Sequence, residues 1–174
     1  MGELIIILIR LVVPLSIFRW PLAGGVASML LDALDVVLIE MFGLGGFSNY
    51  AALDKALDMY YLSIALYVSL EWQPLAKWTS VVLFAYRGVG FVIFEATQMR
   101  IFLLIFPNLF ENFYLFYLVL MKVRPQYVLI PRHLAVFLVL LLIPKLAQEY
   151  LLHFAEAQPW NWFKSNVLRD SWRF

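Results

Sequence analysis

Cysteine, histidine and charge are what this sequence has least of. It contains no cysteine, which excludes disulfide bonds, thiolate chemistry and metal sites built on cysteine. Its two histidines, His133 and His153, leave little room for a metal site built on imidazole. The net charge of +1 gives no reason to propose a nucleic acid as a partner.

Charged residues make up only 14% of the chain, and hydrophobic residues make up 64%. A soluble domain averages about 25% charged and about 45–50% apolar residues. The apolar runs do not alternate with polar residues, which argues against a membrane β-barrel. The sequence therefore predicts an all-α, polytopic integral membrane protein, and we expect it in the plasma membrane. No small-residue cleavage site follows the apolar start, so we expect a retained first helix.

Six apolar segments are long enough to be membrane-spanning helices, since a span needs about 20 mostly apolar residues, with a range of roughly 17–25. They cover residues 4–20, 26–42, 53–70, 75–96, 100–121 and 133–154. We expect Pro21 and the pair Gly24–Gly25 to separate the first two. The sequence thus predicts one membrane domain, residues 1–174, folded as a six-helix bundle. Its tryptophans near the span ends fit an interfacial belt; these are Trp20, Trp72, Trp78, Trp160 and Trp162.

Four aspartates lie in or beside the second and third predicted spans. Asp32 and Asp35 are three positions apart, and Asp54 and Asp58 are four apart, so each pair occupies one helix face. An aspartate near the bilayer centre costs about 2.5–3.5 kcal/mol, so such residues normally face a bundle interior and have partners. The Gly-rich link at 43–46 lets the two helices run antiparallel, and the acidic faces can then converge.

Four carboxylates cannot all remain ionised together in a dry site. Either some are protonated, or basic residues pair with them, or cations bind. Sites made of carboxylates alone suit Mg²⁺, Mn²⁺ or Ca²⁺. The structural alternative needs no metal: Asp54 starts a helix at the interface, and Lys55 or Arg10 neutralises the remaining acids.

This arrangement resembles the CDP-alcohol phosphatidyltransferase family, whose signature is D-x2-D-G-x2-A-R-x8-G-x3-D-x3-D. Asp32-x2-Asp35 matches its first half and Asp54-x3-Asp58 its last two aspartates, with one extra residue between the halves. The opening helix with Arg10 and Pro14, and Arg87 in the fourth span, are also similar to the family. The signature Gly is replaced by Val36, and its Ala-Arg by Ile39-Glu40.

The resemblance implies a six-helix membrane enzyme, usually a homodimer, that acts in phospholipid biosynthesis. By position, Asp32, Asp35, Asp54 and Asp58 would hold Mg²⁺ or Mn²⁺, and Asp58 would also serve as the catalytic base for the acceptor hydroxyl. The metals would stabilise the charge that develops on phosphorus. The implied substrates are a nucleotide-linked donor and a lipid or alcohol acceptor.

The fifth and sixth spans contain further polar residues. Asn108, Glu111 and Asn112 lie nearly on one helix face after Pro107, where they can form interhelical hydrogen bonds or a second wall of the same cavity. Lys145 in the sixth span can extend toward the interface or pair with Glu111.

Three functions remain open from the sequence. The first is a divergent, metal-dependent phosphotransferase. The second is a non-catalytic six-span protein on the same fold, for example an accessory subunit of a larger membrane complex. The third is a small transporter that uses the acidic residues, although the sequence shows no inverted repeat.

Overall fold

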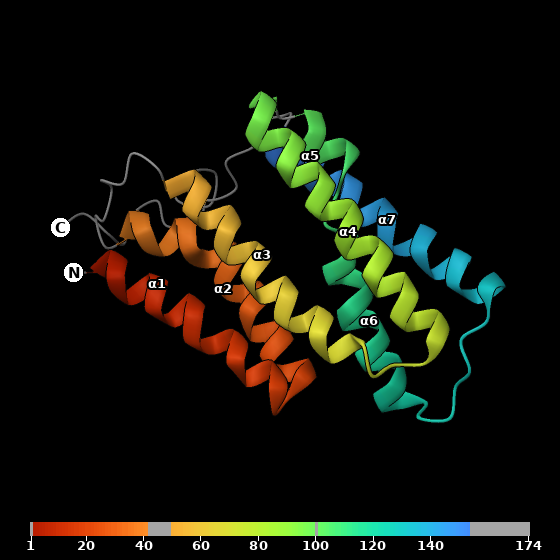
Figure 1. The fold of residues 1–174 in the computed structure, drawn as a ribbon. Helices are drawn as coiled ribbons and strands as arrows, with labels where there is room; N and C mark the ends of the chain where they lie inside the picture. The colour runs from red at the N-terminus through yellow and green to blue at the C-terminus, as the bar shows by residue number, and fades with distance from the viewer. Residues whose placement is uncertain (1, 42–49, 100, 154–174) are drawn as a thin grey trace, which may run out of the picture.

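The computed structural model describes residues 2–41, 50–99 and 101–153, and side chains at 4–34, 53, 55–99, 101–148 and 150. Within these residues the regular structure is helical, with no strand, as Figure 1 shows. The all-α fold expected from the composition is confirmed. Two of the six expected segments are each divided into two helices, and the other four are single helices.

The first expected span consists of α1 (Gly2–Val12) and the 3₁₀ helix η1 (Val13–Phe18). Pro14 has no N–H to donate, which favours the change of helix type here. α2 (Pro21–Met41) begins earlier than expected, with Pro21 at a position that proline favours. A Cβ at Gly24 would lie 2.6 Å from the Ile17 backbone nitrogen, so this glycine lets α2 pack closely on η1. The expected break at Gly24–Gly25 is therefore wrong.

The third and fourth expected spans are α3 (Tyr50–Ser69) and α4 (Pro74–Thr97), which pack against each other. α4 starts with a proline in its first turn. It ends at Gln98, whose left-handed backbone (φ 56°) closes the helix.

The fifth expected span is not one continuous helix. It is divided into α5 (Ile101–Ile105) and α6 (Leu109–Val123) at Pro107, because proline cannot donate to a helix and disfavours helical backbone at Phe106. The break lies against α4, where a Cβ at Gly90 would approach the Phe106 Cβ to 2.2 Å. The sixth expected span is α7 (Pro131–His153).

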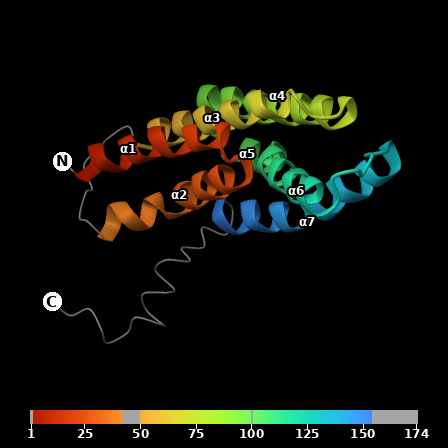
Figure 2. The ribbon, with the colours of Figure 1, turned by 90° about the horizontal axis from the view of Figure 1, so that it is seen from below.

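α6 lies in the middle of the bundle, in contact with α2, α3, α4 and α7, as Figures 1 and 2 together show. Its buried side chains include Phe110, Phe113, Tyr114 and Tyr117. The Trp72 ring packs on Tyr114 and Tyr117 with centroids 5.4 and 4.4 Å apart. Trp72 is half-buried and packs against the core from the α3–α4 connection. Trp160 and Trp162 lie outside the described residues.

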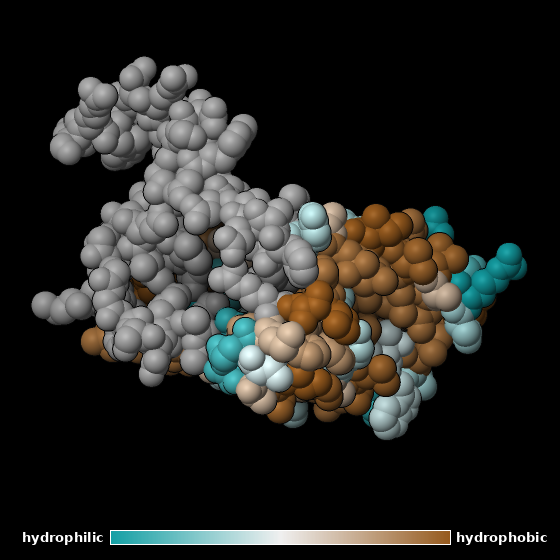
Figure 3. All heavy atoms as spheres, turned by 90° about the horizontal axis from the view of Figure 1, so that it is seen from above, coloured by the Kyte–Doolittle hydropathy of each residue, from teal (hydrophilic) through white to brown (hydrophobic). Residues whose placement is uncertain are grey.

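Three of the described segments are long and apolar enough to cross a membrane, and they are Pro74–Thr97, Ile101–Val123 and Pro131–Gln148. Leu4–Phe18 and Pro21–Leu34 are apolar but shorter. Large apolar side chains on α1, α4 and α7 face outward, and Figure 3 shows a broad hydrophobic surface over the described residues. Apolar exposure on this scale indicates contact with lipid or with another protein.

Candidate functional site

The first polar contact inside the bundle joins α1 to α2. Arg10 Nη2 donates to Asp32 Oδ1 in an ion pair, and the Arg10 side chain is only 4% exposed. The Asp32 side chain keeps 33% of its surface exposed. Pairing with a cation is what a carboxylate among apolar helices requires. Arg10 therefore neutralises the charge of Asp32, as the structural alternative without a metal ion predicted.

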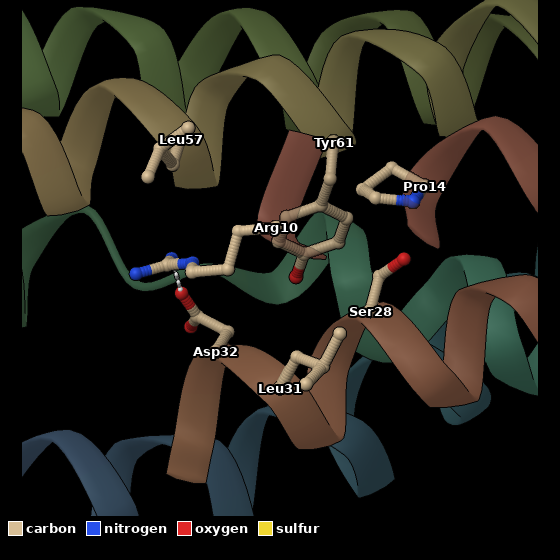
Figure 4. Close-up of a pocket in the computed structure, with 7 residues that line it drawn as sticks. All are labelled: Arg10, Pro14, Ser28, Leu31, Asp32, Leu57 and Tyr61. Carbon is tan, nitrogen blue, oxygen red and sulfur yellow. Dashed lines mark hydrogen bonds and ion pairs between the residues drawn. The ribbon is translucent and has the colours of Figure 1, made fainter. Parts of the chain in front are cut away.

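A small cavity lies beside this pair. Figure 4 shows its lining, which α1, η1, α2 and α3 supply. The residues are Arg10, Pro14, Ser28, Leu31, Asp32, Leu57 and Tyr61. The cavity volume is about 10 Å³, enough for roughly one water molecule. The Ser28 hydroxyl on its wall donates to the Gly24 carbonyl of its own helix.

The second polar contact joins α3, α4 and the break before α6. Arg87 Nη2 lies 3.7 Å from Asp58 Oδ2, and both side chains are 12% exposed. The other arm of the guanidinium, Nη1, donates to the Phe106 carbonyl at 3.1 Å. Phe106 lies between α5 and α6, where the carbonyls that follow a helix end have no intrahelical donor. Arg87 thus places its charge beside the Asp58 carboxylate and donates a hydrogen bond to a carbonyl at the helix break.

The third polar contact is centred on Glu111 in the first turn of α6. Tyr61 of α3 donates its hydroxyl to Glu111 Oε1, and Asn108 Nδ2 donates to Oε2 at 3.2 Å. Asn108 also caps α6, since its Oδ1 accepts from the Glu111 backbone N–H at 3.4 Å. Lys145 Nζ of α7 is 4.0 Å from Glu111 Oε2, which confirms the pairing that the sequence suggested.

These contacts form what we call the central network, which receives a side chain from each of the six expected spans. Its members are Arg10, Asp32, Asp58, Tyr61, Arg87, Asn108, Glu111 and Lys145. Arg10, Asp32 and Tyr61 line the same cavity, and Tyr61 donates to Glu111, which connects the first contact to the third. Three carboxylates and three cations give the ionised network no net charge. A neutral sum limits the cost of placing these groups in an apolar interior.

The structure places two of the four predicted metal ligands. Asp32 lies on α2 and Asp58 on α3, each with a basic partner from another helix. Asp35 and Asp54 lie on the same two helices, but their side chains are outside the described residues. Among the described side chains, no group of three carboxylates and imidazoles is close enough to hold a metal ion. The four-aspartate metal site, with Asp58 as the base, stays a prediction.

Two members of the central network were not singled out as partners from the sequence. Tyr61 is three positions after Asp58, so it occupies the same face of α3 and its spacing was a usable signal. Asn108 and Glu111 have the spacing of a capping box, in which the first residue caps the helix and the fourth reaches back. That pattern was also a usable signal for where α6 begins, although it was not applied when the spans were predicted.

Comparison of the chain with protein-family models, with curated proteins and with solved structures finds no match.

Proposed function

We propose that this chain is a six-span membrane protein with a structural role, held together in the bilayer by the central network. The observation that supports it is the pairing of Asp32, Asp58 and Glu111 with basic residues from other helices. A role as an accessory subunit of a larger membrane complex fits this interpretation, because the described residues form helices with short connections and no separate domain.

The acid–base pairs support this role because together they involve all six expected segments. The three acid–base pairs join α1 to α2, α3 to α4, and α6 to α7. Tyr61 and Glu111 then connect α3 to α6. Between transmembrane helices there is little hydrophobic driving force, so packing and polar contacts hold the bundle together. The central network supplies such contacts for all six segments.

A second candidate is a divergent, metal-dependent phosphotransferase similar to the CDP-alcohol phosphatidyltransferases. It is favoured by the contact between α2 and α3 and by the 33% exposure of Asp32. Asp35 and Asp54 are one helical turn from Asp32 and Asp58, each toward the link between the two helices. In this proposal all four aspartates bind Mg²⁺ or Mn²⁺, and Asp58 accepts the proton of the attacking alcohol.

A Mn²⁺ titration of the purified protein separates the two functions. Melting temperatures are measured for the wild type and for Asp32→Asn/Asp54→Asn, with Glu71→Gln as a control that removes an exposed acid in the α3–α4 connection, outside the central network. A bound metal at about 100 times its Kd stabilises a protein by about 2.7 kcal/mol. The structural role predicts no such gain, and it predicts that the double variant melts lower because Arg10 loses its charged partner.

A Mn²⁺-dependent stabilisation that the aspartate variant lacks and Glu71→Gln retains would contradict the structural role and support the enzyme. Purification in mild detergent then tests the accessory-subunit part of the proposal. A stoichiometric second protein that elutes with the chain supports it. Recovery only as a lone homo-oligomer counts against it.

A further inference from the structure

Three connections between helices lie at one end of the molecule, along the lower edge and up the right-hand side of Figure 1. They are the η1–α2, α3–α4 and α6–α7 connections, at residues 19–20, 70–73 and 124–130. Gln73 joins two of them: its Nε2 donates to the Tyr127 carbonyl at 2.8 Å, and its Oε1 accepts from the Leu129 N–H at 3.3 Å. The Phe18 ring contacts Tyr67 of α3 with centroids 5.8 Å apart, which places the third connection beside them.

Positive charge dominates this end, which we call the basic end. Its cations are Arg19, Lys77, Lys122, Arg124 and Arg132. All except Lys77 are exposed. Among the described residues of these connections and the adjoining helix turns, Glu71 is the one acid. A surface with this balance attracts anions through its combined potential.

Two exposed tryptophans mark the same end. Trp20 follows Arg19 and is 62% exposed, and Trp78 lies in the first turns of α4 and is 61% exposed. The Lys77 ammonium is 5.9 Å from the centre of the Trp78 ring. Tryptophan concentrates at the level of lipid headgroups, where one edge of the ring is apolar and the other is wet. Exposed tryptophans beside these cations fit a position of this end at headgroup depth.

The α6–α7 connection also contains a hollow. Arg124, Pro125, Gln126 and Tyr127 line an open hollow of about 430 Å³. The hollow is open along the surface, and four consecutive residues of the connection form it. Gln73 fixes the backbone on one side of it, and a hydrogen bond between Tyr127 and His133 fixes the ring on the other. The hollow is thus shaped before any ligand arrives.

We propose that the basic end binds the headgroups of anionic phospholipids in the leaflet that it faces, with one headgroup in the hollow beside Arg124. This inference depends on the proposed membrane location. The phosphate accepts hydrogen bonds from Arg124, and the neighbouring cations supply long-range attraction. A zwitterionic lipid has no net negative charge for the surface to select.

The test is native mass spectrometry of the detergent-purified protein, titrated separately with phosphatidylglycerol and phosphatidylcholine. A juxtamembrane cation contributes about a five-fold change in affinity for an anionic surface. We therefore expect tighter binding of phosphatidylglycerol to the wild type, about five-fold weaker binding to Arg124→Gln, and near wild-type binding to Arg124→Lys. Lys55→Gln is the matched control, because it removes one positive charge from the first turns of α3 at the other end.

Equal affinity for the two lipids overturns the inference. Equal weakening by Arg124→Gln and Lys55→Gln also overturns it, since binding then follows total charge and not this end. Extraction of cell membranes with alkaline carbonate comes first and tests the premise separately. Release of the chain into the soluble fraction contradicts the proposed membrane location, whereas retention without a phosphatidylglycerol preference contradicts only the lipid site.

Discussion

Replacing Arg87 by glutamine removes a cation from Asp58 and a donor from the helix break. Breaking a buried ion pair costs about 3–5 kcal/mol in soluble proteins. Measured polar contacts between transmembrane helices average about 0.6 and reach about 1.7 kcal/mol. The Asp58–Arg87 distance of 3.7 Å is long for a charged hydrogen bond, but Arg87 also donates to Phe106 at 3.1 Å. We therefore expect Arg87→Gln to lower the free energy of unfolding by about 2 kcal/mol.

The assay is a double-mutant cycle of Asp58→Asn, Arg87→Gln and the double variant. The unfolding free energy is measured by SDS titration of protein in mild-detergent micelles. We expect the double variant to lose less than the sum of the single losses, with a coupling of about 1 kcal/mol or more. Lys77→Gln, which removes a cation at the basic end, should cost less than about 0.5 kcal/mol. Strictly additive single losses would refute the pairing.

The remaining predictions concern packing and hydrogen bonds, and the same unfolding assay checks each. Gly90→Ala should cost about 1–3 kcal/mol because its Cβ would lie 2.2 Å from another side chain, whereas Gly88→Ala has 3.8 Å of room and should be neutral or stabilising. Tyr61→Phe removes the hydrogen-bond donor from Glu111 Oε1 and should cost about 1–3 kcal/mol. Gln73→Leu removes both of its hydrogen bonds to the α6–α7 connection and should cost about 1–2 kcal/mol. Equal effects of the two glycine variants, or no loss in the others, would contradict these contacts.

The positions of the helices were largely predictable from the sequence. Apolar length and the prolines set the approximate bounds, because a span has a fixed minimum length and proline marks helix starts. Two details were not predictable from local pattern. Gly24 is a packing position inside α2 and not a break, and only the closeness of η1 shows this. Pro107 divides residues 101–123 into two helices, although the hydropathy of this segment predicts one continuous span.

The candidate site was predictable in its residues and in part of its pairing. Arg10, Arg87 and Lys145 stood out because a charged residue in an apolar segment needs a partner. Glu111 and Lys145 were matched from the sequence, and the structure brings them to 4.0 Å. Arg10 was one of two cations expected to neutralise the aspartates, and the structure places it beside Asp32, whereas Arg87 was not expected as the partner of Asp58. The spacing of residues shows which of them share a face of one helix. It does not show which other helix packs against that face.

The central claim is that all six segments cross the bilayer, and the absence of cysteine makes it directly testable by labelling. Single cysteines are introduced in place of Arg19, Glu71 and Gln126 in the three connections, and in place of Leu8 and Val139, which are 56% and 57% exposed on α1 and α7. Each variant is treated, in intact cells and in opened membranes, with a maleimide that cannot cross membranes.

Six spans predict that the three connection cysteines react, all from the same side of the membrane. They also predict that the cysteines at Leu8 and Val139 stay unlabelled, because lipid covers side chains that the bundle leaves exposed. Rapid labelling at Leu8 with protection at Val139 would limit the spans to the later helices and contradict the six-span arrangement. Rapid labelling at both positions would contradict the membrane location itself.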